Sequence, residues 1–413
     1  MTFPRKAFTS PKFWMLSALY FVEGMPWGFQ SKALPVFMRT QSASLTSIGL
    51  LSLLSLPWML KILWAPLVDR YGSRSFGERK SWIVPLQAML VLACLAAAHM
   101  ARSDLSNLWP LMALVGLMNL FAATMDIAVD GLAVDVLQDE ELGTGNIAQV
   151  VGYKFGTLMS GGLLVWATGD IGWPGLFLGM AAFVAVVCVL TARFREPPRR
   201  ASGEPKQSMG DILGMLSQAL REPGALPLFL VIATYKSGEQ FVDAMFKPFL
   251  VDAGFSPQQV GLWVSTFGMG ASLAGSFVGG LAASRWPLYP SLVVSAALRV
   301  IPLVGVVLLT MRLPSPTTIV AVALAENFFG GVLTTVMFAF MMSRTNKRIG
   351  ATHFTLLSTV EMVGKAPIPM LAGAVADARG YTNTFGLGAI LSLLYLGLLL
   401  PLRKHASRPP PAV

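Results

Sequence analysis

Several long apolar stretches of this 413-residue sequence contain charged side chains, and the acids among them could carry a proton. Glu23, Glu239 and Glu361 stand near the middle of such stretches, and Asp126 is a fourth candidate. A carboxyl group there can change its protonation when its surroundings alternate between wet and dry, because desolvation favours the neutral form and a nearby lysine favours the charged form. These four residues are therefore candidates for coupling a proton to another process.

A second set of polar side chains could hold the carboxylate, catecholate or phosphate groups of a solute. The set comprises Tyr153, Lys154, Lys236, Lys365, Glu326 and Asp243. Lys236, Glu239 and Asp243 follow one another at spacings of three and four, so a helix would align them on one face as a polar path. Glu361 and Lys365 are four residues apart, which suits an ion pair with or without a role in binding.

The charges in these stretches must be shielded from lipid. Each one costs roughly 2.5 to 3.5 kcal/mol at the centre of a membrane helix, so we expect most of them to face a cavity and to pair. Lys61, Asp130 and Asp135 lie nearer to one end of their stretches, where a side chain can reach the interface. The sequence indicates no role for Arg299.

The stretches are long enough to cross a bilayer. With 54% hydrophobic residues, 13% charged residues and a mean hydropathy of +0.63, the chain has too little polar surface for a soluble globular protein. Trp14 to Phe37 is as long as the roughly 20 residues that a span requires, and no small-residue cleavage site follows it, so we expect a retained span. The predicted spans are residues 13 to 38, 46 to 66, 82 to 101, 108 to 135, 146 to 167, 173 to 194, 226 to 250, 258 to 283, 288 to 311, 316 to 342, 350 to 375 and 383 to 402.

The basic residues indicate how these spans are oriented. Twenty of the 31 Lys and Arg residues fall in the gaps on one side of the predicted spans or, for Arg193, at the last turn of a span on that side, and four fall in the gaps on the other side. Cytoplasmic loops carry an excess of Lys and Arg, so we expect both termini in the cytoplasm. The formal net charge of +10 then reflects topology and contact with anionic headgroups, and no nucleic-acid partner is expected.

Other function classes lack their sequence signals. Cys94 and Cys188 lie in apolar stretches and the three histidines are scattered, so we expect neither a disulfide nor a metal site, and no cofactor. The pattern GxxxxGK followed by Ser or Thr does not occur, which argues against ATP as the energy source. His99 and Asp104 have a spacing found in some acyltransferases, but they lie far from the charges at mid-span. A membrane-embedded acyltransferase is therefore the weakest alternative.

A weak internal repeat indicates the architecture. Pro35 to Leu50 and Lys247 to Leu262 share positions at an offset of 212 residues, and Asn119 matches Asn327 at an offset of 208. Parallel six-helix repeats are the architecture of the major facilitator transporters. We therefore predict an all-α membrane protein with twelve transmembrane helices in two six-helix halves. The predicted bounds are 1–194 for the first half, 195–225 for a cytoplasmic linker and 226–413 for the second half.

Three stretches make the resemblance to one family specific. ILWAPLVDRYGSRSFGERK (Ile62 to Lys80), MDIAVDG (Met125 to Gly131) and GYKFGTLMSGG (Gly152 to Gly162) resemble the AmpG-type muropeptide permeases of the peptide and acetyl-coenzyme A transporter family. Tyr20 to Arg39 is more similar to the bacterial siderophore permeases of that group. The resemblance implies a proton-driven importer of a polar small molecule across the bacterial inner membrane, either a muropeptide or a ferric siderophore. The first helix favours the siderophore.

The resemblance also implies a cytoplasmic gate. Asp69, Arg70, Gly72 and Arg74 match the family's D-R-x-G-x-R loop between the second and third spans, although Ala65 stands where the usual pattern has glycine. The carboxylate could meet the positive end of a neighbouring helix, while the arginines pair with an acid such as Asp135. The predicted gate residues are Asp69, Arg70, Arg74, Asp130 and Asp135. The alternative is a solvated basic loop with no further role.

Two more expectations concern assembly and signalling. A transporter-like membrane sensor that signals through residues 195–225 is an alternative function, although this linker is short and polar. Runs of small residues such as Gly268 to Gly280 pack helices within one copy, so we expect a monomer in the bilayer. The proline-rich tail from Ala406 to Val413 is predicted to be disordered.

Overall fold

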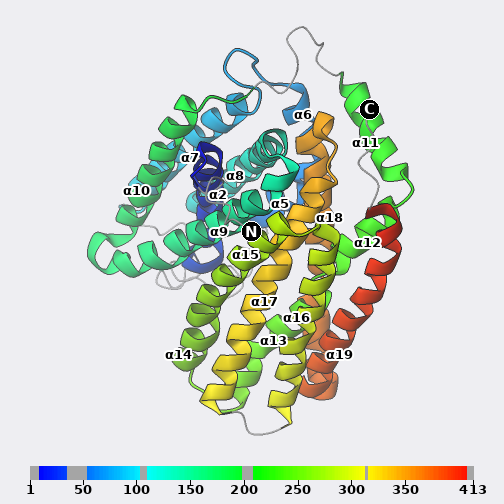
Figure 1. Ribbon diagram of the computed structural model, residues 1–413. Helices are drawn as coiled ribbons and strands as arrows, with labels where there is room; N and C mark the ends of the chain where they lie inside the picture. Colours follow the sequence, from blue (N-terminus) through cyan, green and yellow to red (C-terminus); the bar gives the residue numbers. More distant parts are fainter. Residues whose placement is uncertain (1–8, 35–53, 103–108, 198–207, 312–314, 407–413) are drawn as a thin grey trace. The chain divides into compact units, whose positions relative to one another are not determined.

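The computed structural model describes residues 9–34, 54–102, 109–197, 208–311 and 315–406 (Figure 1). Within these ranges the chain is helical, and the only β pairing is an isolated bridge between Ser73 and Gly77. The first copy of the predicted repeat at residues 35–50 and most of the tail, residues 407–413, lie outside the described residues.

Helices dominate because a segment in lipid must satisfy its backbone hydrogen bonds internally. Their bounds, with η marking 3-10 or π-helical turns, are α2 (Pro11–Gly28), η1 (Phe29–Ala33), α5 (Leu56–Leu60), η3 (Lys61–Leu63), α6 (Ala65–Arg70), α7 (Lys80–Met100), α8 (Trp109–Val136), η4 (Asp139–Glu141), α9 (Leu142–Leu158), η5 (Met159–Leu163), α10 (Leu164–Arg193), α11 (Met209–Arg221), α12 (Ala225–Thr234), α13 (Ser237–Asp252), α14 (Pro257–Val260), η6 (Gly261–Phe267), α15 (Gly268–Arg285), α16 (Leu288–Thr310), α17 (Pro316–Ser343), η7 (Lys347–Ile349), α18 (Gly350–Lys365) and α19 (Ile368–Ala406).

These elements form twelve transmembrane helices. Among the described residues, seven helical stretches are long and apolar enough to cross a membrane. Two of them, Asp139–Arg193 and Lys347–Leu402, each contain two spans joined at one glycine, Gly172 (φ 67°, ψ 175°) or Gly380 (φ 76°, ψ 171°). Three interrupted segments complete the set: α2 with η1, α5 to α6, and α12 with α13. The chain is therefore an all-α membrane protein.

The internal repeat is visible in the backbone as well as in the sequence. Gly172 and Gly380 have nearly the same conformation, which is essentially restricted to glycine. They are separated by the same 208 residues that separate Asn119 from Asn327. Both asparagines donate a side-chain hydrogen bond of 2.9 Å to the backbone carbonyl four residues earlier. Matching positions of the two halves thus adopt matching local geometry.

Two compact units divide the chain. Unit 1 comprises Met1–Leu137, Ala148–Leu216 and Asn346–Thr355; unit 2 comprises Gln138–Ile147, Ser217–Thr345 and Leu356–Val413. Each unit therefore includes a short segment from the opposite half of the sequence. The bounds that the sequence suggests for the halves and the linker stay a prediction.

In unit 1, α7 packs against α8 and α10, and α2 packs against α8 (Figure 1). Small residues let α2 approach α9 very closely. A Cβ atom on Gly156 would clash with the carbonyl oxygen of Phe21, and one on Gly24 would clash with that of Tyr153. This approach places Glu23, the neighbour of Gly24, close to α9.

In unit 2, α17 packs against α15 and α16, and α19 packs against α13 and α16 (Figure 1). Buried residues from five helices form one core, including Phe249 of α13, Val260 of α14, Leu303 of α16, Ile319 of α17 and Phe385 of α19. The rings of Phe249 and Phe385 meet edge to face, with centroids 5.7 Å apart. This core fixes α13, which carries several of the predicted polar candidates.

The linker between the halves contains a helix that the sequence analysis did not predict. The backbone N–H of Asp211 in α11 donates to the Ser208 hydroxyl at 3.1 Å, and the backbone N–H of Ser208 donates to the Asp211 carboxylate at 2.8 Å. Hydrogen bonding to the side chain and backbone of Ser208 lowers the pKa of Asp211. A reciprocal cap of this kind marks the start of a helix, and Ile212 in the first turn is buried.

Candidate functional site

Three predicted acids of the first half gather around one lysine in unit 1. Lys61 forms a buried ion pair with Asp126 of α8. Asp130, one turn further along α8, accepts hydrogen bonds from the Tyr20 hydroxyl at 2.8 Å and from the Gln149 amide at 3.1 Å. Both aspartates thus have partners that stabilise a negative charge. We refer to Lys61, Glu23, Asp126 and Asp130 as the unit 1 cluster.

Glu23 of α2 differs from the two aspartates because no described residue donates a hydrogen bond to its carboxyl group. Its side chain is fully buried, and neither carboxyl oxygen has a hydrogen-bond partner among the described residues. Asp126, Asp130 and Lys61 lie close enough to interact with it electrostatically. Asp126 is also within hydrogen-bonding reach of Glu23, but two ionised carboxylates have no hydrogen to share. A proton would provide that hydrogen.

Aromatic and amide groups surround the unit 1 cluster. The Trp58 indole donates to the Asn119 side chain at 3.0 Å, and the Lys61 ammonium lies 5.7 Å from the Trp58 ring centroid. Tyr153 of α9 is close enough to interact electrostatically with the acids of the cluster, and Lys154 beside it is half-buried. The structure therefore brings Tyr153 to the proton candidates.

Arg299 of α16 is the centre of the second group, which we call the unit 2 cluster: Arg299, Glu239, Asp243 and Glu326. The buried guanidinium pairs with the Glu326 carboxylate and also donates to the Glu326 backbone carbonyl. Its Nε lies 3.4 Å from one oxygen of Glu239, and Lys236 Nζ lies 3.6 Å from the other. Asp243 is close enough to interact with Arg299 electrostatically. Arg299 thus interacts with acids from both α13 and α17.

The helical stripe expected on the seventh span is interrupted. α12 ends at Thr234 and α13 begins at Ser237, so Lys236 lies in the turn between two helices. Glu239 is buried, whereas Asp243 and Lys247 on the same helix are exposed. The burial of the polar side chains on α13 therefore decreases from Glu239 toward Lys247.

Glu361 and Lys365 of α18 form an ion pair. Lys365 Nζ lies 2.9 and 2.8 Å from the two oxygens of Glu361. The Tyr235 hydroxyl donates a further hydrogen bond to Glu361 at 3.2 Å. Three hydrogen bonds, two of them from a cation, hold this carboxylate in place.

A buried ion network follows α6, and we call Asp69, Arg79 and Asp135 the latch cluster. Asp69 accepts a hydrogen bond from Arg79 at 2.8 Å and a second from the backbone N–H of Thr352 at 2.7 Å. Thr352 stands in the first turn of α18, where the helix dipole is positive. Arg79 is fully buried and donates to Asp135 at 2.9 Å. This residue ties both carboxylates together.

The structure corrects the expected partner of Asp135. Arg70 instead lies over the ring of Tyr71, at 5.3 Å from its centroid, and Arg74 pairs with Glu78 at 3.5 Å. The loop folds back through the bridge between Ser73 and Gly77, which brings Arg79 rather than the nearer arginines to the aspartates. Asp130, also expected at the gate, lies in the unit 1 cluster.

Glu196 holds the backbone at the start of α7. Its carboxylate accepts hydrogen bonds from the N–H groups of Arg79 at 2.9 Å and Lys80 at 2.8 Å, which have no partner within the helix. Lys80 Nζ in turn donates to the carbonyls of Ala192 and Phe194, at the end of α10, at 3.2 and 3.0 Å. The ends of α7 and α10 are thereby joined.

The surroundings shift the pKa values of both partners in this arrangement. Burial raises the pKa of Glu196, and the two backbone hydrogen bonds only partly oppose that shift. For Arg79, burial alone would lower the pKa, but the carboxylates of Asp135 and Asp69 outweigh it, so the pKa is raised. Arg79 therefore stays charged in the latch cluster.

Sequence reasoning missed three buried cations. It placed Arg79 among the loop residues, gave Lys61 no specific partner and assigned no role to Arg299. Their partners are 56, 65 and 27 residues away along the chain for the pairs Arg79 with Asp135, Lys61 with Asp126, and Arg299 with Glu326. Helical spacing reveals only neighbours within about one turn. The available signal was that a cation buried in an apolar stretch must have a partner.

Comparisons with known proteins place these features in a family context. Residues 12–168 match the family model "Acetyl-coenzyme A transporter 1", and residues 228–413 match the model of the Major Facilitator Superfamily. The anhydromuropeptide permease of Escherichia coli (strain K12) is 30% identical over 401 residues, covering 97% of this chain and 81% of that protein. The putative transporter AmpG 4 of Rickettsia conorii is 25% identical, covering 97% of this chain and 99% of that protein.

Solved structures share the fold. A crystal structure of the Major Facilitator Superfamily transporter FucP in the outward conformation matches with a TM-score of 0.72 and 14% identity, covering 97% of this chain and 100% of that one. A structure of the E. coli fucose:proton symporter FucP matches with a TM-score of 0.66 and 14% identity, covering 96% and 98%. At this identity the likeness shows the fold alone.

Proposed function

Because this chain belongs to the AmpG-type permeases of the major facilitator superfamily, we propose that it imports a muropeptide across the bacterial inner membrane together with protons. A member of this superfamily is a transporter and not an enzyme. The acyltransferase interpretation of His99 and Asp104 is therefore dropped; Asp104 also lies outside the described residues. We further propose a monomer with both termini and the linker in the cytoplasm, as the distribution of basic residues indicates.

The single observation that carries proton coupling is the isolation of Glu23. Its buried carboxyl group lacks every hydrogen bond among the described residues, and it lies beside two other acids. A charged carboxylate in these surroundings loses its hydration and gains no donor. Binding a proton removes the charge and allows a hydrogen bond to Asp126, so Glu23 is the proton carrier in this proposal.

The other three proton candidates, unlike Glu23, have cationic partners. Asp126 pairs with Lys61, and Glu239 lies between Arg299 and Lys236. Glu361 is held by Lys365. The charge of each of these carboxylates is therefore already matched by a basic side chain. We therefore assign these acids to the polar lining of each unit rather than to proton transfer.

The proposed cargo is a sugar linked to a short peptide, whose carboxylates need cationic partners. Within unit 2, Lys236 and Lys365 are the proposed anchors, with Asp243 and Glu326 as further polar candidates. Within unit 1, the candidates are Lys154 and Tyr153. A lysine can exchange a carboxylate of the protein for one of the cargo without a change in charge. The 30% identical relative is named for anhydromuropeptide, which favours this cargo over the ferric siderophore.

Alternating access requires a closure that can open. The latch cluster connects Asp69 and Asp135, from the first half of the sequence, with the start of α18 from the second half. We propose that it closes the cytoplasmic side and that Arg79 is its central residue. The alternative function, a membrane sensor, would signal through residues 195–225, which contain α11. No contact among the described residues favours this alternative.

The experiment is uptake of labelled anhydromuropeptide into proteoliposomes with and without an inward proton gradient. Wild type is expected to accumulate the label only with the gradient. Glu23→Gln, which resembles the protonated form, is expected to lose accumulation but to keep exchange of labelled for unlabelled cargo. Glu140→Gln, at an exposed position, is the matched control and should behave as wild type.

Two results would contradict the proposal. Gradient-driven accumulation by Glu23→Gln at the wild-type level would remove Glu23 as the proton carrier. Uptake of a labelled ferric siderophore in place of the muropeptide would contradict the proposed cargo but not the proposed transport function.

A further inference from the structure

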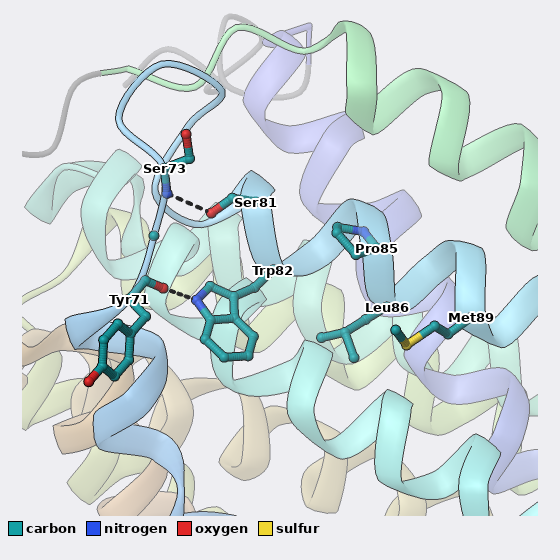
Figure 2. Close-up of a pocket in the computed structure, with 8 residues that line it drawn as sticks. Tyr71, Ser73, Ser81, Trp82, Pro85, Leu86 and Met89 are labelled. Atoms are coloured by element: carbon teal, nitrogen blue, oxygen red, sulfur yellow. Dashed lines mark hydrogen bonds between the residues drawn. The ribbon is translucent and has the colours of Figure 1, made fainter.

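A pocket of about 380 Å³ lies at the start of α7, apart from the unit 1 and latch clusters (Figure 2). Ser73 and Ser81 form its polar end, and Leu86 and Met89 form its apolar end. Figure 2 shows the Trp82 ring between the two ends, with its indole N–H directed at the Tyr71 carbonyl. Neither proton coupling nor cargo binding makes use of this pocket.

The apolar end of the pocket joins an exposed stripe on α7. Met89, Leu92 and Leu95 follow one another at spacings of three and are 46%, 65% and 43% exposed. On a membrane-spanning helix such a stripe contacts the acyl chains of lipids. From Ser81 to Met89 an α-helix rises about 12 Å. The pocket therefore runs from the loop level into the depth of the acyl chains.

The polar end has a hydroxyl hydrogen to donate. The Ser81 hydroxyl already accepts from the Ser73 N–H and donates to the Glu78 carbonyl, both at 3.0 Å. The hydroxyls of Ser73 and Ser75 lie 3.0 Å apart, and one hydrogen is enough to join them. The second hydroxyl hydrogen of this pair remains for a ligand oxygen.

Arg70 does not line the pocket but is the neighbour of Tyr71, which does. Its guanidinium stacks on the ring of Tyr71, which lines the pocket, at 5.3 Å from the ring centroid. No carboxylate among the described residues forms an ion pair with Arg70; the two aspartates of the latch cluster pair with Arg79. A stacked guanidinium keeps donors for bidentate contact with a phosphate.

We propose that this pocket binds one anionic phospholipid. Arg70 and the Ser73 and Ser75 hydroxyls hold the headgroup phosphate, and one acyl chain lies along Trp82, Leu86 and Met89. Free phosphate would leave the apolar end empty, and a zwitterionic lipid would leave the charge of Arg70 uncompensated. Because Arg70 directly follows Asp69, an occupied pocket also steadies the loop that carries the latch cluster.

The test uses the full chain in vesicles and the fluorescence of Trp82. The chain has ten tryptophans, so the Trp82 contribution is the difference between wild type and Trp82→Phe. Phosphatidylglycerol or phosphatidylcholine with brominated acyl chains is titrated into unbrominated phosphatidylcholine. Half-quenching of Trp82 is expected at a mole fraction of brominated phosphatidylglycerol about fivefold lower than that of brominated phosphatidylcholine. This factor corresponds to the attraction of one basic residue to an anionic lipid.

Trp286→Phe provides the matched control. Trp286 follows α15, is 56% exposed and does not line the pocket, so its quenching should show a smaller preference. Arg70→Gln should abolish the preference of Trp82. Equal half-quenching by the two lipids, or the same preference at Trp82 and Trp286, would overturn the proposal.

A second measurement does not depend on fluorescence. Native mass spectrometry of the purified chain should show one retained phosphatidylglycerol, and Leu86→Trp, which fills the apolar end, should lose it. Leu117→Trp, on an exposed face of α8, is the control and should keep it. Retention by both variants would contradict the site, and displacement by excess inorganic phosphate alone would assign the polar end to a free anion.

Discussion

Glu23 and Arg79 are both fully buried ionisable residues, yet their surroundings are opposite. Arg79 has two carboxylates within 2.9 Å and a backbone fixed by Glu196. Glu23 has acids for neighbours and no donor. A fully paired charge such as that of Arg79 can stabilise the fold and a closed state. A carboxyl group such as that of Glu23, which gains a hydrogen bond only when it is protonated, can respond to a proton.

The first prediction at this scale concerns Arg79→Gln. The substitution leaves the buried carboxylates of Asp69 and Asp135 without their cation, which costs about 3–5 kcal/mol. Thermal unfolding of the purified protein should show a large decrease in Tm. The control is Arg74→Gln, because Arg74 is 43% exposed and its pair with Glu78 is worth at most about 1 kcal/mol. Similar Tm values for both variants would contradict the assignment of Arg79 to the latch cluster.

The second residue-scale prediction concerns Glu196 and pH. Burial raises its pKa in the folded protein, so folding favours the protonated form. The stability from this shift is present below the ordinary glutamate pKa of about 4.3 and is lost as the pH rises through the raised value. Gln cannot titrate, so the Tm of Glu196→Gln should improve relative to wild type as the pH rises across that window. A Tm difference that stays constant with pH would exclude this titration; Glu140→Gln controls for the loss of one charge.

At the scale of elements, single glycines set the turns between long helices. Gly172 and Gly380 have positive φ with ψ near 175° and 171°, and neither lacks room for a side chain. Any cost of a substitution there is conformational rather than steric. The close approach of α2 to α9 is the opposite case, because Gly24 and Gly156 leave no space for a Cβ atom.

The prediction at this scale compares alanine substitutions on one helix. Gly380→Ala should lower the free energy of unfolding by about 1–3 kcal/mol, because alanine rarely adopts this backbone conformation. Gly386→Ala, six residues further along α19, has no neighbour within 4 Å and should be neutral or stabilising by up to about 1 kcal/mol. Gly172→Ala should match Gly380→Ala if the two turns are equivalent. Equal stability of the Gly380 and Gly386 variants would contradict the role of φ.

At the scale of the whole molecule, the fold could be predicted because the bilayer demands long apolar segments and leaves basic residues outside them. The twelve helices and the family are confirmed. Local spacing also identified the pair of Glu361 with Lys365. It could not identify Arg79 or Arg299, because their partners come from other helices. Glu23 could be selected by depth, but only the structure shows that it lacks a donor.

The one-residue turns at Gly172 and Gly380 also bear on biogenesis. In each pair a single glycine joins the two spans. No longer loop separates the first span from the second while the second is being synthesised. We expect each pair to enter the bilayer as a helical hairpin rather than as two separate helices. The chain would thus be assembled partly in hairpins rather than in single helices.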